Sequence, residues 1–349
     1  MISETEFTAK KSSGSVKVTF TFDATSLKGK TTVVFEELYQ DEMQLAVHTD
    51  INDEDQTIYF PEIKTTAKDA DTNSNISCAK EEITLVDTVS FKGLVPNQKY
   101  EVTGTLIDKE TKKPVEADGK PVTAKASFKP KESAGTVDVT FTFDASSLKG
   151  KTVVVFESLA YKDKEVAVHT DIADEGQTIY FPEIKTTAKD GSDGDQDVSA
   201  SKEATIVDTV TYHGLMPGSE YKVIGTLMNK ETGEALLKDG KPVTAQAEFK
   251  AEKAGGSVEV TFTFDASALA GQDVVVFEKL YYTDGKTEHE IASHEDLDDK
   301  GQTIKLTEAP KDTPEPSKPV KTGDETTVLP YLLLAGAALL FAAGFGILY

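Results

Sequence analysis

The sequence contains no tryptophan, only one cysteine and, among its 37 basic residues, no arginine. A single cysteine, Cys78, excludes an intrachain disulfide, so an exported protein of this composition must stabilise its domains in another way. The net charge of −23 argues against nucleic acid as a partner, because binding it requires basic patches that displace counterions from phosphates. The first residues are polar and acidic, which predicts that this chain carries no signal peptide.

Long hydrophobic runs are also missing, with one exception near the C-terminus. Residues 328–349 form a stretch of 22 residues without a charge, which is enough for a helix that spans a bilayer. We predict a hydrophobic membrane-spanning helix there. The residues before it, 309–327, are rich in Pro, Lys and Thr and predict a semi-rigid spacer.

An internal repeat dominates the rest of the chain. The segment that starts at Gly14 returns at Gly135 and at Gly256, offsets of 135 − 14 = 121 and 256 − 135 = 121 residues. This period is far too long for a solenoid repeat and suits a whole domain. The first strands of the first repeat would precede Met1, so we expect that repeat to be a truncated C-terminal half. The predicted repeats span residues 1–61, 62–182 and 183–308.

Each repeat has the pattern of β-structure throughout. Apolar and polar side chains alternate over residues 137–143, which is typical of half-buried strands. Asp118-Gly119 and Asp239-Gly240 supply turn residues between strands. The sequence therefore predicts an all-β fold of tandem immunoglobulin-like β-sandwich domains.

A polar stretch recurs near the end of every repeat. It consists of a His, an Asp five positions later and a Gln eight positions later. The three copies are His48, Asp53 and Gln56; His169, Asp174 and Gln177; and His294, Asp299 and Gln302. Residue types alone leave three interpretations open: a hydrogen-bonded turn copied with its domain, a small reactive centre, or a calcium site built from the neighbouring carboxylates Asp171, Asp174 and Glu175.

Two further motifs accompany this stretch. A Val-Val-Phe-Glu segment ends at Glu36, Glu157 and Glu278, and an Asp-Thr-Val segment near the start of each complete repeat contains Thr88 and Thr209. Taken together, the motifs resemble the Thr–Gln ester-bond (VaFE) repeat domains of Gram-positive cell-wall-anchored surface adhesins. In that family a Thr hydroxyl attacks a Gln side-chain amide, ammonia leaves, and a permanent ester joins two strands.

The resemblance implies a role for each recurring residue. The cross-linked pairs would be Thr88–Gln177 and Thr209–Gln302. His169 and His294 would accept the Thr proton. Glu157 with Asp174, and Glu278 with Asp299, would form acidic pairs that polarise the amide carbonyl, each holding at least one proton.

The first repeat would hold an unpaired partial site made of Glu36, His48, Asp53 and Gln56. Because no Thr partner exists for it in this chain, we expect it to stay unreacted. The chemistry needs neither a metal ion nor a cofactor. It happens once in each domain, so it is self-modification and not enzymatic turnover.

A second resemblance concerns the C-terminal region. Residues 319–323, Pro-Val-Lys-Thr-Gly, are similar to a sortase cell-wall sorting signal ahead of an apolar span. This implies cleavage between Thr322 and Gly323, with attachment to peptidoglycan or to a pilus subunit. The motif departs from the usual L-P-x-T-G, and no basic tail follows Tyr349, so a plain single-pass anchor is the alternative. Both interpretations place the repeats outside the cell.

We therefore predict the structural stalk of a Gram-positive surface adhesin or pilus-like protein, locked by ester cross-links and anchored at the cell wall. A host ligand would bind through domains upstream of this sequence. The alternative is a binding module whose sandwiches themselves contact a host protein or glycan. The sequence pattern, however, shows no group of aromatic residues that would form a binding platform. A hydrolase that acts on an external substrate is disfavoured, because the electrophile is already part of the chain.

Overall fold

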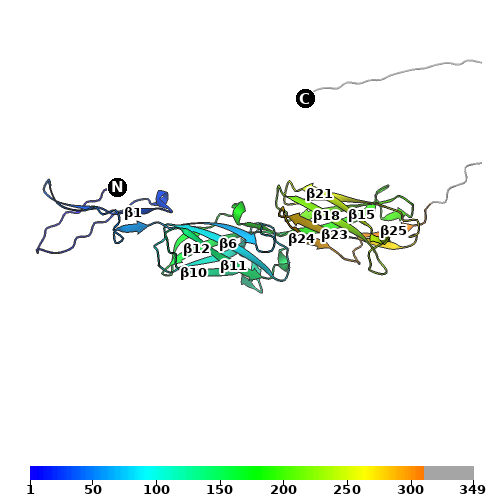
Figure 1. Cartoon of the computed structure of the whole chain (residues 1–349), viewed down its shortest axis with the longest axis horizontal. Helices are drawn as coiled ribbons and strands as arrows, with labels where there is room; N and C mark the ends of the chain where they lie inside the picture. The colour runs from blue at the N-terminus through cyan, green and yellow to red at the C-terminus, as the bar shows by residue number, and fades with distance from the viewer. Residues whose placement is uncertain (310–349) are drawn as a thin grey trace, which may run out of the picture. The chain divides into compact units, whose positions relative to one another are not determined.

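The computed structural model describes residues 1–309, and the all-β prediction is confirmed there (Figure 1). The predicted spacer and C-terminal helix, including Thr322 and Gly323, lie outside the described residues. Within residues 1–309 the only helical segments are three single-turn 3-10 helices. None of the helices in this part of the chain is long and apolar enough to cross a membrane.

Residues 61–181 form a sandwich of two antiparallel sheets. One sheet has the order β10 (Thr123–Phe128), β7 (Tyr100–Asp108), β12 (Thr152–Tyr161) and β13 (Lys164–His169), with β14 (Thr178–Tyr180) also paired to β12. The other has the order β11 (Gly135–Phe143), β6 (Ile83–Lys92) and β5 (Glu62–Asp69). The short elements are β8 (Glu116–Ala117), β9 (Lys120–Pro121), η2 (Ser146–Leu148) and η3 (Glu175–Gln177). One apolar core fills the space between the two sheets and includes Leu85, Val102 and Val155.

Residues 182–306 repeat this arrangement. The larger sheet has the order β16 (Asp197–Ser199), β25 (Thr303–Thr307), β23 (Asp273–Thr283), β18 (Glu220–Asn229) and β21 (Thr244–Lys250), with β24 (Glu288–His294) also paired to β23. The smaller sheet has the order β15 (Glu183–Asp190), β17 (Ala204–His213) and β22 (Gly256–Phe264). A two-stranded sheet contains β19 (Leu237–Lys238) and β20 (Lys241–Pro242).

Residues 1–60 form only two separate strand pairs. Their elements are η1 (Thr25–Leu27), β1 (Thr31–Val33), β2 (Glu36–Gln40), β3 (Met43–His48) and β4 (Thr57–Tyr59). β1 pairs with β4, and β2 pairs with β3. No residue of this segment is buried, and large apolar side chains such as Phe22, Phe35 and Leu45 are exposed.

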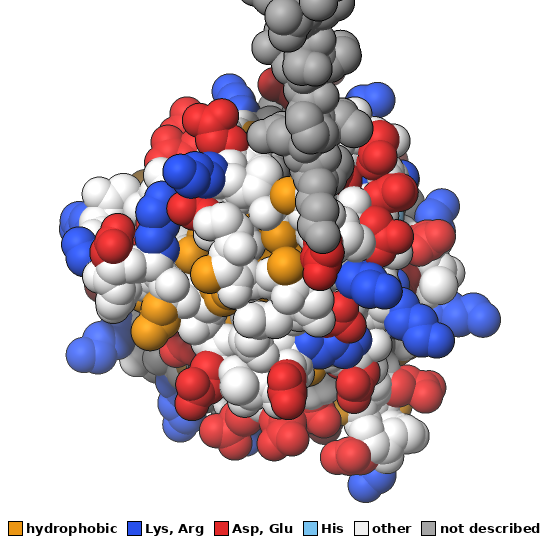
Figure 2. Space-filling view, turned by 90° about the vertical axis from the view of Figure 1, so that its right-hand side faces the viewer, with side chains coloured by type: hydrophobic (Ala, Val, Ile, Leu, Met, Phe, Trp, Pro, Cys, Tyr) orange, Lys and Arg blue, Asp and Glu red, His pale blue; other side chains and the backbone are white. Residues whose placement is uncertain are grey.

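The period of two along the inner strands places polar groups inside the sandwich as well as apolar ones. On β5, Ile63, Thr65 and Ala67 face the core while the lysines and Thr66 between them face outward. On β6, Asp87 faces the core between Leu85 and Val89. The charged side chains that face outward mix both signs, as the end of the molecule in Figure 2 shows. A threonine and an aspartate on apolar strand faces require an explanation.

Candidate cross-linking site

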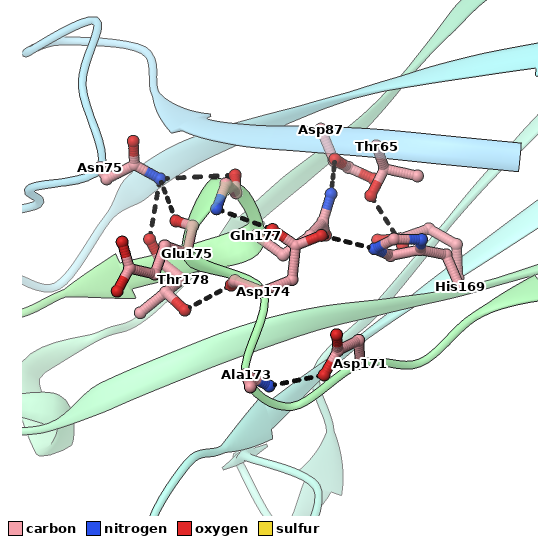
Figure 3. A network of polar contacts seen from close by, with 12 residues as sticks. Thr65, Asn75, Asp87, His169, Asp171, Ala173, Asp174, Glu175, Gln177 and Thr178 are labelled. Carbon is pink, nitrogen blue, oxygen red and sulfur yellow. Dashed lines mark hydrogen bonds and ion pairs between the residues drawn. The ribbon is translucent and has the colours of Figure 1, made fainter.

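Four polar side chains meet inside the sandwich of residues 61–181 (Figure 3). Thr65 from β5 is 8% exposed, Glu157 from β12 is 1% exposed, and Asp87 from β6 and Gln177 at the end of η3 are 0% exposed. Burial of polar groups costs free energy unless they find partners in the interior. The partners of these four groups therefore define the site.

The hydroxyl and the amide contact different members of a carboxyl pair. Thr65 Oγ1 donates to Glu157 Oε2 at 3.0 Å, and Gln177 Nε2 donates to Asp87 Oδ1 at 3.1 Å. Asp87 and Glu157 are hydrogen-bonded to each other. A hydroxyl group that can act as a nucleophile and an amide that can act as an electrophile thus belong to one hydrogen-bond network. The two carboxyl groups lie between them.

The two carboxyl groups share a proton. If both were ionised, Asp87 Oδ2 and Glu157 Oε1 would be buried acceptors without a donor, which is a costly state. Burial, reinforced by the hydrogen bond with Asp87, raises the pKa of Glu157 to about 10. Burial also raises the pKa of Asp87 to about 6, although the bond with Glu157 and the nearby His169 act in the opposite direction. At neutral pH the pair therefore holds one proton and one negative charge between its two members.

A glycine opposite the buried glutamate leaves room for an aromatic ring in the core. Gly104 on β7 is the register partner of Glu157 on β12. A Cβ at position 104 would lie 2.6 Å from Cζ of Phe141, so only glycine leaves room for this ring in the core. The equivalent pair in the next unit is Gly225, opposite Glu278, with Phe262 packed against it.

A histidine–aspartate pair lies at the edge of this cluster. His169 Nε2 and Asp174 Oδ2 are 2.8 Å apart, and His169 is the register partner of Glu157. The other oxygen of Asp174, Oδ1, accepts a hydrogen bond from Gly176 N at 2.8 Å and caps the turn that carries Gln177. Asp174 therefore links the imidazole to the reactive amide segment.

Two predicted pairings need correction, and the first is the acidic pair. The partner of Glu157 is Asp87 and not Asp174, which is bound to His169 instead. In residues 182–306, Glu278 likewise has Asp208 as its carboxyl neighbour, while Asp299 Oδ2 lies 3.1 Å from Nε2 of His294. Two of the four buried carboxyls were thus missed by the sequence reasoning.

The second correction concerns the threonine. The structure does not bring Thr88 and Gln177 together, because Thr88 follows Asp87 on β6 and points to the opposite face of the sheet. Its hydroxyl donates to Asp138 Oδ1 at 2.8 Å in an exposed contact. Thr209 occupies the same half-buried position on β17, opposite Glu259. The threonines that reach the buried carboxyl pairs are Thr65, which is hydrogen-bonded to Glu157, and Thr186, which is hydrogen-bonded to Glu278.

A sequence signal for the correct threonine exists. The segment Pro-Glu-Ile-Lys-Thr-Thr-Ala-Lys-Asp is identical at residues 61–69 and 182–190. Its alternation places the first Thr of each copy on the face of the apolar Ile and Ala, where a hydroxyl has no packing advantage. Asp87 gives the same signal, since it lies between Leu85 and Val89 on an apolar strand face.

The second centre, in residues 182–306, has the same composition and closer contacts. Thr186 Oγ1 donates to Glu278 Oε2 at 3.1 Å. Gln302 Nε2 donates both to Glu278 Oε2 and to the hydroxyl of Thr186, so the hydroxyl and the amide touch directly. Burial, reinforced by Asp208, raises the pKa of Glu278 well above its usual value, and burial also raises the pKa of Asp208.

The first copy of the motif, in residues 1–60, is incomplete. His48 Nε2 and Asp53 Oδ2 are 2.7 Å apart, and Glu36 is the register partner of His48. Among residues 1–309, however, the side chain of Gln56 forms no hydrogen bond with a carboxyl or hydroxyl group, whereas Gln177 and Gln302 do. Among residues 1–309, no three acidic, His or Cys side chains are grouped so that they could hold a metal ion.

Comparison with protein families gives a match in all three repeats. The T-Q ester bond containing domain matches residues 1–60, 61–181 and 182–306. Comparison with curated proteins found no match.

Among solved structures, a Mobiluncus mulieris adhesin with intramolecular disulfide, isopeptide and ester bond cross-links is similar over 62% of this chain and 80% of its own, at 13% identity and a TM-score of 0.31. The C-terminal domain of the Streptococcus agalactiae AgI/II polypeptide BspA is similar over 67% of this chain and 98% of its own, at 9% identity and a TM-score of 0.33.

Proposed function

Because the chain belongs to the T-Q ester bond containing domain family, we propose that its two buried centres form intramolecular esters, Thr65 with Gln177 and Thr186 with Gln302. One observation carries this proposal: in each unit, a buried threonine hydroxyl and a buried glutamine amide lie on the same pair of proton-sharing carboxyls. A merely structural network would not need an ionisable pair in an apolar core.

The proposed reaction balances within the site. Thr65 Oγ1 attacks Cδ of Gln177, the new C–O bond replaces the C–N bond, and the side-chain nitrogen leaves as ammonia. The hydroxyl proton passes to Glu157 Oε2, with which it is already hydrogen-bonded. Glu157 passes its own proton to Asp87, and Asp87 delivers it to the departing nitrogen, which already donates to Asp87 Oδ1. No cofactor takes part in this step.

The histidine has a different role in this scheme from the one that the resemblance implied. Glu157 and not His169 is hydrogen-bonded to the Thr65 hydroxyl, so we assign the first proton transfer to the carboxyl. Burial raises the pKa of Asp87, and His169 acts against this shift. Through Asp174 it also fixes the turn that presents Gln177.

Each ester would join the first strand of its unit to the segment before the last. The bond closes a loop of 177 − 65 = 112 residues in one unit and of 116 residues in the other. By the chain-entropy argument used for disulfides, closing loops of this length stabilises a domain by about 5 kcal/mol. Tension applied to the ends of a unit would then run through a covalent bond. These properties suit the stalk of a surface adhesin.

The same proposal covers the anchoring of the stalk. Residues 319–323 and the apolar stretch 328–349 support covalent attachment to peptidoglycan, or to another subunit, by a sortase. Replacing Thr322 by Ala then prevents release of the protein together with cell-wall fragments after muralytic digestion. Unchanged covalent attachment of this variant would favour a plain membrane anchor.

Proteolytic mapping tests the ester itself. A digest of the native protein should yield one branched peptide that contains Thr65 and Gln177 and a second that contains Thr186 and Gln302. Hydroxylamine should split both, because it cleaves esters and leaves ordinary peptide bonds intact. Four separate linear peptides with unmodified glutamines would overturn the proposal.

A further inference from the structure

One side-chain amide in each unit lies against the backbone of the reactive glutamine segment. In residues 61–181 it is Asn75, in the loop between β5 and β6, and Figure 3 shows it beside η3. In residues 182–306 it is Gln196, just before β16. The two positions are 196 − 75 = 121 residues apart, which is the repeat period, although the residue types differ.

Asn75 holds the segment with several hydrogen bonds from one nitrogen. Asn75 Nδ2 donates to Thr178 O at 2.8 Å and to Ala67 O at 3.1 Å, with longer contacts of 3.5 Å to Glu175 O and Gly176 O. All four partners are carbonyl oxygens, so only the nitrogen of the amide fits there. Ala67 lies two residues after the threonine nucleophile, and Thr178 follows the glutamine. A single NH2 group therefore ties the nucleophile strand to the electrophile segment.

Gln196 does the same with a side chain that is one methylene longer. Gln196 Nε2 donates to Lys300 O at 2.8 Å, to Thr303 O at 3.0 Å and to Gly301 O at 3.2 Å. In this unit the backbone itself makes the link to the nucleophile strand, because Ala188 N donates to Gly301 O at 2.9 Å. In both units the amide binds the carbonyls that precede and follow the reactive glutamine.

The backbone of each amide residue is fixed independently of its side chain. Tyr180 N donates to Asn75 O at 2.8 Å, and Ser77 N donates to Tyr180 O at 2.9 Å. Lys305 N donates to Gln196 O, also at 2.8 Å. Loss of the side-chain amide should therefore leave the loop in place and release only the glutamine segment.

We propose that Asn75 and Gln196 are positioning residues, which hold the reactive glutamine carbonyl carbon within attacking distance of the threonine hydroxyl. This inference rests on the proposed ester formation. A misplacement of about 1 Å in a reacting group can slow a reaction about 100-fold, so a tether on both sides of the glutamine has a large effect on the rate.

Isosteric substitutions test the donor role with little change in shape. We would synthesise each variant in a cell-free system, stop samples in acid at intervals and measure ammonia loss for each unit by peptide mass. Asn75→Asp replaces the NH2 donor by an acceptor and should slow esterification of residues 61–181 at least about tenfold. Asn75→Gln should retain the wild-type rate, since glutamine performs this role in the next unit. Gln196→Glu should slow only the Thr186–Gln302 reaction.

The two units serve as controls for each other in the same molecule. In Asn75→Asp, normal ester formation between Thr186 and Gln302 shows that the protein folds and the chemistry works. Wild-type rates in both Asn75→Asp and Gln196→Glu would overturn the positioning role while leaving the proposed function intact. If the wild-type protein loses no ammonia in either unit, the proposed function fails and this inference fails with it.

Discussion

The first 60 residues and the two units that follow contain the same histidine–aspartate motif in different surroundings. The His–Asp distance is 2.7 Å for His48, 2.8 Å for His169 and 3.1 Å for His294. The side chain of His48 is 51% exposed, compared with 19% and 21% for the other two. Only around the latter two does a buried carboxyl pair lie beside a threonine and a glutamine.

This difference shows which parts of the centre are local and which depend on the whole sandwich. The strand pair that ends in His and the turn that follows form the His–Asp contact without a core around them. The perturbed carboxyl pair needs two sheets, because one acid comes from β6 and the other from β12. In our account, reactivity requires the dry carboxyl pair and the threonine strand in addition to the His–Asp pair.

Removal of the nucleophile should have the largest effect. Thr65→Ala prevents the cross-link in residues 61–181, leaves one more ammonia in the protein and lowers the free energy of unfolding of that unit by about 5 kcal/mol. Hydrogen exchange of the core amides of β12 measures the loss unit by unit. The matched control is Thr88→Ala, which should still lose two molecules of ammonia relative to its own sequence. Loss of two ammonia molecules in Thr65→Ala together with loss of only one in Thr88→Ala would reverse our assignment.

The carboxyl pair provides the next test. Glu157→Gln keeps the shape of the side chain but removes the group that receives the hydroxyl proton, so ester formation should slow by about 10² to 10⁴-fold in that unit. The equivalent change in the first copy, Glu36→Gln, should leave the rate and the extent of ammonia loss unchanged. Mass measurements during synthesis follow both. A rate close to that of the wild type in Glu157→Gln would show that the proton leaves the hydroxyl by another route.

The stability of the unit should depend on pH because Asp87 and Glu157 titrate. The folded-state pKa of Asp87 is about 6 and that of Glu157 about 10, and both lie above the usual values of 3.8 and 4.5. The folded state therefore binds more protons than the unfolded state, and its stability falls as the pH rises through these windows. We expect uncross-linked Thr65→Ala to lose stability from about pH 4 towards pH 10.

The double variant Thr65→Ala/Glu157→Gln separates this effect from the titration of other groups. Because its residue 157 does not titrate, its stability should depend less steeply on pH above about pH 5. Thermal unfolding of both variants across a pH series gives the comparison. Equal slopes would mean that Glu157 is ionised in the folded unit and that the shared proton is absent.

The smallest effects should come from the exposed motif of the first copy. His48→Ala should change neither the loss of ammonia nor the stability of residues 61–306, since exposed substitutions change stability by at most about 0.5 kcal/mol. His169→Ala should slow ester formation in its own unit, because it loosens the turn that holds Gln177. Rates from the same time-resolved mass measurement compare the two. Equal rates of ester formation in the two variants would contradict our claim that only the buried motif contributes to the reaction.

The sequence predicted the all-β fold and located the recurring His, Asp and Gln segment, because these depend on local patterns, but it paired Asp174 with Glu157 and not with His169. His169, Asp174 and Gln177 lie within nine residues, and their spacing fixes their contacts in one turn. The threonine and the second acid were misassigned because they come from strands far away in the chain. Thr65 and Thr88 lie on two neighbouring strands of one sheet. They differ in the face of the sheet to which the side chain points.

Intact mass of the purified chain tests the central claim most directly. Three copies of the glutamine motif are present, but only two have a buried carboxyl pair and a threonine. The account predicts a mass lower than that of the sequence by two molecules of ammonia, with Gln56 unmodified. A folded protein with the full mass of its sequence would contradict it.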